Sequence, residues 1–361
     1  MSLRNFSREF SSKILRKFLS AASSEEKSFG QLRAILIVRP HNQFGDMLAS
    51  VSLLRAVKET YPECRITLIA SPENYHSVVK NEFVDELFVF DKKKLINPNY
   101  YLQFKKVLSK KYDLAIVPVT VAVSATSCIL AGLANAKFKI GPRSLNGEVN
   151  RNAFVFTHSV DLNWKKCPDA HVSDFILDLV RPFGIKTKNY GTSISFTSED
   201  IKFAEDFIKQ VHKESARKLI GFHIGAGKTQ NKWPLQKFFD SINSLKECFD
   251  FDFYFTGSGA DKDEIKFMKE RFASDAGFFI DNTITQLAAL ISLSDLFITN
   301  DTGVMHVAGA TSVSQISLFG PTNPFNWAPV GPNKYFIRKS DLINDIAVED
   351  LVGLVKYILG K

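Results

Sequence analysis

Four loops of the sequence combine residue types suited to binding a phosphorylated ligand or to moving a proton. The first spans residues 39–46 and reads Arg-Pro-His-Asn-Gln-Phe-Gly-Asp, between an apolar run and a helical stretch. Gly45 permits a tight turn, and the Asp46 carboxylate could accept a proton from a substrate hydroxyl. Aspartate is also a favoured helix cap that complements the helix dipole, so this loop alone favours capping over catalysis.

Small residues and lysines characterise the second loop, residues 223–234. Gly225 and Ala226 leave backbone N–H groups accessible to a phosphate, and Lys228 and Lys232 supply compensating positive charge. An ordinary polar loop with solvated lysines is the alternative interpretation.

The third loop, residues 256–264, nearly matches a dinucleotide-binding fingerprint. Gly257 and Gly259 stand at its first two glycine positions, but Lys262 occupies the third, where glycine lets a helix pack closely on a pyrophosphate. Glu264 lies one helical turn further on and could accept hydrogen bonds from ribose hydroxyls. A solvated position on the helix surface is the alternative for this glutamate.

The fourth loop, residues 300–310, is the most informative. Thr302 and Gly303 open a helix rich in small residues, where N–H groups and a hydroxyl could bind an anion such as a diphosphate. His306 lies one turn further along, and Thr322 ends the rigid Phe-Gly-Pro-Thr turn after the next apolar run. Both could face the same anion, although a single histidine is more often structural.

The spacing of apolar residues predicts an α/β fold that would position these loops. Short apolar runs alternate with amphipathic stretches, as in repeated strand–helix units around parallel sheets. Each loop follows a predicted strand, and open α/β sheets bind ligands at the carboxyl ends of their strands. The expected strands are 34–38, 65–69, 87–90, 114–117, 138–140, 219–223, 251–256, 278–280, 296–299, 315–318 and 335–338, and the main expected helices are 169–183, 199–212 and 348–359.

The chain length of 361 residues favours two domains. We expect a basic amphipathic segment at residues 1–30 and a first Rossmann-like domain at 31–190. A second Rossmann-like domain would span 191–345, and a final helix at 346–361 could cross back to the first domain.

Composition excludes several protein classes. With 45% hydrophobic and 23% charged residues, the chain is neither disordered, collagen-like nor a disulfide scaffold. No apolar run reaches the roughly 18 residues of a membrane span, and no secretory signal is visible. The four cysteines lack zinc-ligand spacing and no Asp-x-Asp pair stands at a strand end, so we expect a cytoplasmic protein without metal or cofactor.

Positive charge is concentrated at the start of the chain. Residues 1–20 carry five basic residues and one acidic residue, which is +4 of the net +8, so nucleic-acid binding is not expected. Apolar residues recur there every three or four positions, a pattern typical of a helix lying on an anionic bilayer. A frayed tail or a helix packed on the protein body is the alternative. The apolar residues are Leu3, Phe6, Phe10, Ile14 and Phe18.

From about Ala34 to Gly360 the chain resembles glycosyltransferase family 9, the lipopolysaccharide heptosyltransferases. The most specific part is Asp-Thr-Gly-x-Met-His at 301–306 followed by Phe-Gly-Pro-Thr at 319–322. The resemblance implies a GT-B fold, in which two Rossmann-like domains with parallel sheets face each other across a cleft. The first domain would bind the acceptor and the second the nucleotide-sugar donor. Weaker matches are Phe44-Gly45-Asp46, Lys232-Trp233-Pro234, and Gly257 with Glu264.

The resemblance also implies a role for each matching residue. Asp46 corresponds to the family's proposed general base, Lys232 to its phosphate-binding lysine and Glu264 to its ribose contact. Asp301 would orient the diphosphate-binding loop or contact the donor sugar. The other residues predicted to line the donor site are Gly225, Ala226, Thr302, Gly303, His306 and Thr322.

The implied reaction is inverting transfer of heptose from ADP-heptose to a lipopolysaccharide core acceptor, either lipid A-Kdo or an inner-core sugar. Arg143 and Arg151 could contact phosphates or acidic sugars of this anionic lipid-linked acceptor, although solvated surface arginines are commoner. The enzyme would act at the cytoplasmic face of the inner membrane of a Gram-negative bacterium, held there by residues 1–20.

Three other functions remain open from the sequence. The donor could be another nucleotide sugar, such as a UDP- or GDP-hexose. An NAD-dependent Rossmann oxidoreductase is suggested by Gly257-Ser258-Gly259, but Lys262 breaks its fingerprint. A non-catalytic anion-binding or membrane-scaffold protein is the third possibility.

Overall fold

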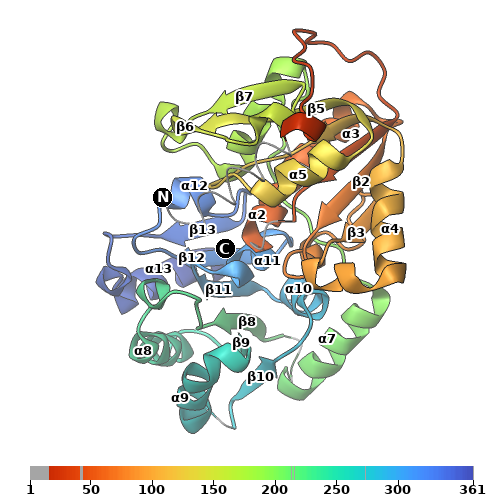
Figure 1. Cartoon of the computed structure of the whole chain (residues 1–361). Helices are drawn as coiled ribbons and strands as arrows, with labels where there is room; N and C mark the ends of the chain where they lie inside the picture. The colour runs from red at the N-terminus through yellow and green to blue at the C-terminus, as the bar shows by residue number, and fades with distance from the viewer. Residues whose placement is uncertain (1–15, 41–43, 213, 215, 273, 361) are drawn as a thin grey trace, which may run out of the picture. The chain divides into compact units, whose positions relative to one another are not determined.

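The structure is a computed structural model that describes residues 16–40, 44–212, 214, 216–272 and 274–360. The chain forms two compact units that divide between Tyr190 and Gly191. Each unit has a mostly parallel sheet with helices on both faces (Figure 1), so the predicted α/β class is confirmed. Throughout these ranges, no helix combines the length and the apolar character needed to cross a bilayer.

The sheet of the first unit has the strand order β3-β2-β1-β4-β5-β6, and β7 also pairs with β5. The β5–β6 pair is antiparallel and the other pairs are parallel. Strand β1 is an almost wholly buried Ala-Ile-Leu-Ile-Val run, as expected where helices cover both faces of a parallel sheet. The strands are β1 (Ala34–Val38), β2 (Arg65–Ala70), β3 (Glu86–Val89), β4 (Tyr112–Ile116), β5 (Ala136–Leu145), β6 (Glu148–Val149) and β7 (His158–Leu162).

Two layers of helices enclose this sheet. On one face, α2 (Phe44–Ala49) and α3 (Val51–Thr60) pack together with the segment that begins at α6 (Val172–Phe175). On the other face, α4 (Pro98–Ser109) and α5 (Ala125–Leu133) share a second apolar cluster.

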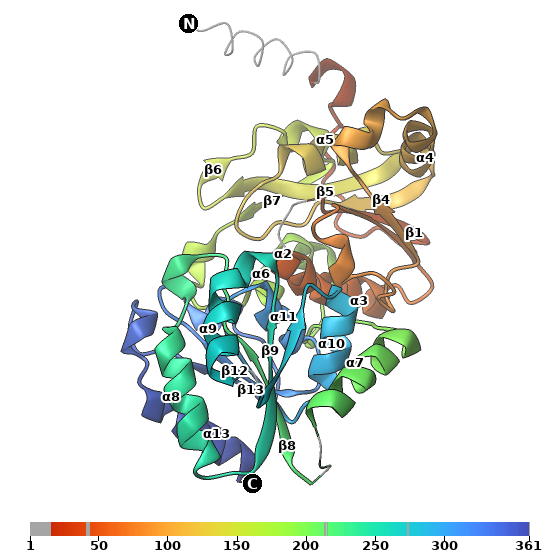
Figure 2. The ribbon, with the colours of Figure 1, turned by 90° about the horizontal axis from the view of Figure 1, so that it is seen from below.

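The start of the described chain belongs to the α4–α5 layer. Residues 16–19 are helical, and Leu19 packs against the apolar cluster of that layer (Figure 2). The Arg16 guanidinium lies 5.4 Å from the centre of the Phe154 ring. The rest of the predicted amphipathic segment, residues 1–15, lies outside the described residues.

The sheet of the second unit is wholly parallel, with the order β10-β9-β8-β11-β12-β13. The chain proceeds outward from β8 to β10 and then in the opposite direction from β11 to β13. The first sheet shows the same reversal between β1 and β4. The strands are β8 (Lys218–His223), β9 (Phe251–Gly257), β10 (Ala276–Ile280), β11 (Leu296–Asn300), β12 (Ser314–Leu318) and β13 (Lys334–Ile337).

Helices cover both faces of the second sheet as well (Figure 1). One face carries α8 (Leu235–Lys246), α9 (Lys262–Phe272) and α13 (Val348–Leu359), whose apolar side chains join one cluster. The other carries α7 (Ser198–Val211) and α10 (Ile284–Ser292), which pack on each other. The final helix, for which the sequence allowed a return to the first domain, packs on α8 within the second unit.

The secondary-structure prediction differs from the structure in the last part of the first unit. Strands β6 and β7 were not predicted, and the helix expected at 169–183 is the single turn α6 followed by two 3₁₀ segments, Ile176–Leu179 and Arg181–Phe183. Pro182 lacks a backbone N–H and its ring would clash with the carbonyl of Asp178 in a helix, so it opposes an α-helix over the last turn of residues 169–183.

Candidate functional site

Three of the four predicted loops, residues 39–46, 223–234 and 300–310, lie at the points where the strand order of each sheet reverses, and the third loop, 256–264, follows the adjacent strand β9. Open α/β sheets bind ligands in the crevice outside the carboxyl ends of their strands at such a point. In the first unit Arg39 follows β1 and Thr120 lies shortly after the neighbouring strand β4. In the second unit the loop with Gly225 follows β8 and Asp301 follows the neighbouring strand β11. Each unit therefore has one candidate site.

Asp46 is the centre of the first site. It lies in the first turn of α2, and only 2% of its surface is exposed. The Thr120 hydroxyl donates a 2.8 Å hydrogen bond to Asp46 Oδ2, and Arg39 Nη2 lies 3.4 Å from the same oxygen. A threonine and an arginine from two adjacent strand ends therefore hold this carboxylate.

Arg39 is a buried cation whose two terminal nitrogens donate hydrogen bonds within this site. Its Nη1 donates to the Pro118 carbonyl and its Nη2 to Thr120 Oγ1, both at 3.0 Å. Burial lowers the pKa of the guanidinium, and the negative charge of Asp46 opposes that effect. Sequence reasoning missed Arg39 and Thr120; the available signal was a cation placed directly after the first buried strand.

Gly225 is required by packing in the second unit. A Cβ atom at this position would lie 2.0 Å from Asp261 Oδ1. The Asp261 carboxylate is fixed there because its Oδ2 accepts 2.9 Å hydrogen bonds from the backbone N–H and the hydroxyl of Ser258. The neighbouring Ala226 is buried, with 8% exposed. The glycine thus accommodates a carboxylate of the third loop.

Replacing Gly225 by alanine should destabilise the second unit by about 1–3 kcal/mol, the usual cost of overpacking a tight site. The matched control is Gly227→Ala in the same loop, where a Cβ would meet nothing within 4 Å. Thermal unfolding of the two variants measures the difference. Equal melting temperatures would contradict the packing role of Gly225.

Asn300 joins the second loop to the fourth, although it was not predicted as a site residue. Its Nδ2 donates to the carbonyl oxygens of Ile224 at 2.9 Å and Gly225 at 3.2 Å. Its Oδ1 accepts from the Trp233 backbone N–H at 3.2 Å. Because Asn300 is completely buried, these bonds fix both loops to the end of β11.

Asp301 connects the fourth loop to two further segments. Asn231 Nδ2 donates to Asp301 Oδ2 at 2.9 Å and to its carbonyl oxygen at 3.2 Å. Burial raises the pKa of the Asp301 carboxyl, whereas a hydrogen bond with Thr322 and the charge of Lys228 oppose the shift. The structure thus brings together Asp301 and Thr322, which were predicted in one site.

Lys232 and Glu264, predicted to contact phosphate and ribose, form an ion pair with each other. Their side chains are 31% and 12% exposed, so the pair lies at the surface of the site. Beneath it His223 is buried, with Nδ1 3.0 Å from Thr256 Oγ1. Burial lowers the pKa of His223, and Asp261 and Glu264 oppose that shift.

The start of α11 (Gly303–Gly309) is accessible. Thr302 precedes the helix in an extended conformation, and Gly303 is exposed. A Cβ atom at Gly303 would meet nothing within 4 Å. His306 lies on the same helix, with its ring 6.2 Å from the Trp327 ring. The backbone of the first turn is therefore accessible at Gly303.

The two arginines predicted to contact an acceptor lie near the β5–β6 hairpin. Arg143 is exposed and pairs with Asp161, and this hydrogen bond raises the pKa of the guanidinium. Arg151 lines a pocket of about 540 Å³ formed by residues 121–125 and the hairpin. This pocket begins one residue after Thr120, which holds Asp46.

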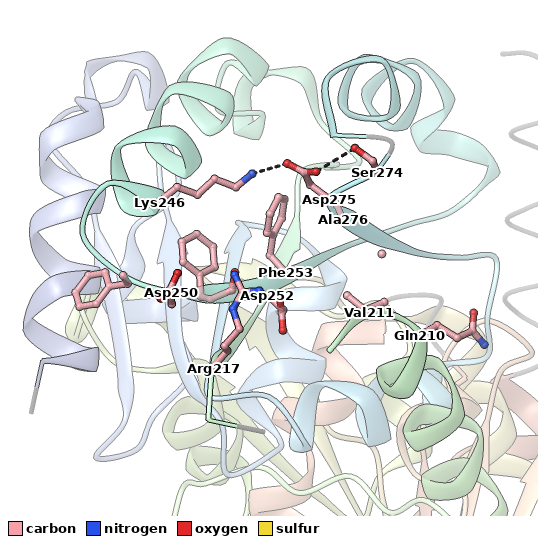
Figure 3. A pocket seen from close by; sticks show the side chains of 13 residues that line it. Gln210, Val211, Arg217, Lys246, Asp250, Asp252, Phe253, Ser274, Asp275 and Ala276 are labelled. Carbon is pink, nitrogen blue, oxygen red and sulfur yellow. Dashed lines mark hydrogen bonds and ion pairs between the residues drawn. The ribbon is translucent and has the colours of Figure 1, made fainter. Parts of the chain in front are cut away.

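A second pocket, of about 480 Å³, lies at the opposite edge of the second sheet, beside the amino ends of β9 and β10 (Figure 3). Four of its charged side chains form two ion pairs: Lys246 with Asp275 at 2.9 Å and Arg217 with Asp252 at 3.0 Å. None of the residues predicted to line the donor site borders this pocket. In the ranges that the structure describes, no three His, Cys, Asp or Glu side chains gather as metal ligands.

Comparison with known proteins gives a consistent result. The model of glycosyltransferase family 9 (heptosyltransferase) matches residues 101–349. Lipopolysaccharide heptosyltransferase 3 of Escherichia coli is 26% identical over 304 residues, which cover 80% of this chain and 84% of that protein. The crystal structure of a family 9 glycosyl transferase from Veillonella parvula DSM 2008 superposes with a TM-score of 0.76 at 20% identity, covering 94% of this chain and 99% of that one. The E. coli ADP-heptose lps heptosyltransferase II gives 0.71 at 18% identity, with 91% and 98% covered.

Proposed function

Because the chain belongs to glycosyltransferase family 9 and has the GT-B fold, we propose that it transfers heptose from ADP-heptose, with inversion, to an anionic lipopolysaccharide core sugar. This proposal rests on the three loops predicted to bind the donor, residues 223–234, 256–264 and 300–310. They lie at the carboxyl edge of the second sheet and within the residues that the family model matches. A relative named a lipopolysaccharide heptosyltransferase and a fold neighbour described as an ADP-heptose enzyme support the choice of substrates. The test is product analysis: ADP-heptose and a lipid A-Kdo acceptor should give ADP and an acceptor heavier by one heptose.

In this proposal Asp46 accepts the proton of the attacking hydroxyl. An ordinary carboxylate, with a pKa of about 4, is a weak base for an alcohol. Proton transfer therefore comes late, when the anomeric carbon has already developed positive charge. Arg39 balances the negative charge of the carboxylate, and the Thr120 hydrogen bond fixes its orientation.

The donor loops are proposed to stabilise the departing diphosphate. Thr302 and Gly303 would donate hydrogen bonds from the open end of α11, and Lys232 would supply positive charge. Preorganised donors of this kind contribute several kcal/mol, more than one proton transfer usually does. Binding of ADP would separate Lys232 from Glu264 and leave the glutamate to accept hydrogen bonds from the ribose.

Lys232→Ala should weaken ADP binding about 10- to 100-fold, because a charge-assisted hydrogen bond contributes about 1.5–3 kcal/mol. Isothermal titration with ADP measures the effect. Lys266→Ala is the matched control, since it removes an exposed lysine of α9 outside the donor loops. An ADP affinity equal to that of the control would contradict the role of Lys232.

We also propose that catalysis requires no divalent metal, because Lys232 and the N–H groups of Thr302 and Gly303 would supply the positive charge that the departing diphosphate needs. Transfer activity should persist in EDTA. A complete loss of activity that magnesium restores would contradict this part of the proposal.

The acceptor is proposed to bind in the first unit, beside Asp46. Arg151 and the pocket of about 540 Å³ next to the Thr120 loop support this placement. The predicted location is the cytoplasmic face of the inner membrane, with residues 1–20 on the bilayer.

Nucleotide selectivity tests the proposed donor. ADP should raise the melting temperature of the protein, whereas UDP, GDP and NAD should not, and this result would favour an ADP-sugar over the alternative donors and over an NAD-dependent enzyme.

A further inference from the structure

A strongly basic surface is formed by the 3₁₀ segment Lys92–Ile96 and the outer side of α4. Between Asp91 and Asp113 the sequence has seven lysines and no acidic residue. Lys110 pairs with Glu86, and the other six lysines are exposed. Within the described part of the chain, none of those six forms an ion pair. They are Lys92, Lys93, Lys94, Lys105, Lys106 and Lys111.

Large apolar side chains project from the same surface. Ile96 is 92% exposed, Leu102 61% and Tyr101 49%. The core-facing side of α4 is supplied by Phe104, Val107 and Leu108, so these exposed residues do not complete the core. We use the name α4 surface for Ile96, Tyr101 and Leu102 with the six exposed lysines.

The arrangement along α4 places charge directly beside the apolar groups. Lys105 and Lys106 follow Leu102 by three and four residues, so they neighbour it on the outer face of the helix. Scattered apolar residues are ordinary on protein surfaces. Three of them within residues 96–102, in a stretch of chain that also has six exposed lysines without an ion pair, are a local concentration of apolar and basic side chains.

We infer that the α4 surface docks on an anionic bilayer. Lysines would contact lipid phosphates, while Ile96 and Leu102 would enter the boundary between headgroups and acyl chains. A nucleic acid would attract the same lysines, but its phosphodiester backbone offers no apolar environment for Ile96 or Leu102. The combination of charge and exposed apolar area therefore favours the bilayer.

This surface is part of the folded body and is separate from the predicted segment 1–20. Both α4 and the described residues 16–19 pack on the same face of the first sheet (Figure 2). Phe18, in that short helical stretch, is 77% exposed. Two weak contacts on one layer suit membrane attachment, because stable anchoring usually requires two signals.

The test is flotation of the full-length protein with vesicles of phosphatidylethanolamine and phosphatidylglycerol, compared with vesicles of phosphatidylcholine alone. Lys105→Glu with Lys106→Glu should lower partitioning onto anionic vesicles at least about tenfold, because each lysine near the surface contributes about fivefold. Ile96→Ser with Leu102→Ser leaves the charge unchanged and should lower it about tenfold as well. The matched control is Lys202→Glu with Lys266→Glu, which makes the same charge change on α7 and α9 and should have little effect.

Three outcomes would overturn the inference. Unchanged binding of both α4 variants would leave segment 1–20 as the membrane contact. A loss with the charge variant but not with the serine variant would indicate a general polyanion site, such as one for nucleic acid. Equal losses in the α4 and control charge variants would indicate a response to net charge alone.

Because the substituted side chains are exposed, we expect the variants to fold, and an unchanged melting temperature checks this. Vesicle binding is measured without substrates, so it is independent of the proposed transfer reaction.

Discussion

Asp46→Asn should lower kcat about 100- to 10,000-fold, the usual contribution of a positioned general base, and leave ADP affinity unchanged. Asparagine keeps the size of the side chain but cannot accept the proton of the acceptor hydroxyl. ADP affinity should persist because the predicted donor loops belong to the second unit. Steady-state kinetics and ADP titration of the same preparation provide the two measurements.

The control for this experiment must separate chemistry from folding. Asp206→Asn changes an exposed aspartate of α7 that pairs only with its neighbour Lys209 among the described ion pairs, so kcat should not change. Asp46→Asn also removes the anion beside buried Arg39, which makes circular dichroism of the variant necessary. A folded Asp46→Asn enzyme with a nearly normal rate would reduce this residue to a structural role.

Arg39→Met is expected to destabilise the first unit by about 3–5 kcal/mol, because it leaves the Asp46 carboxylate buried without its cation. Two domains need not unfold together, so the measurement should report on one of them. Native-state amide exchange in β1 and β4 follows the first unit specifically.

Arg143→Met is the matched control for Arg39→Met. This substitution breaks the ion pair of Arg143 with Asp161 in the same sheet. The two paired side chains are 60% and 50% exposed, so we expect the variant to lose at most about 1 kcal/mol of stability. The double variant Arg39→Met with Asp46→Asn should recover part of the lost stability, since no buried charge then lacks its partner. Equal effects of Arg39→Met and Arg143→Met would refute the importance of the buried pair.

Much of the fold was predictable because parallel strands that are buried on both faces appear in the sequence as short, nearly continuous apolar runs. The apolar runs predicted β1 at Ala34–Val38 and the final helix at Val348–Leu359 with the bounds that the structure has. Strand β7 was missed because only two of its five residues, Val160 and Leu162, are apolar, so its sequence lacks the apolar run of a buried strand. The family resemblance, which rested on residues 301–306 and 319–322, is confirmed by the family match.

The sites were predictable as loops, but their internal contacts were not. Arg39 and Thr120 are 81 positions apart, and only the pairing of β1 with β4 brings them to Asp46. The close approach of the Asp261 carboxylate to Gly225 was likewise not visible in the sequence, and the phosphate-binding role of Gly225 stays a prediction. Sequence spacing gives no information about such contacts, because the side chains involved come from different strand–helix units.

The completely buried Asn300 amide has a consequence for attempts to alter donor preference by loop grafting. Residues 223–234 could not be exchanged alone for those of another enzyme, because the graft would have to offer two carbonyls and an N–H group in register with this amide. A mismatched graft would leave buried polar groups without hydrogen-bond partners, and each such group would lower the stability by about 1–3 kcal/mol. The transplantable module is therefore the second loop together with position 300, two segments far apart in the chain.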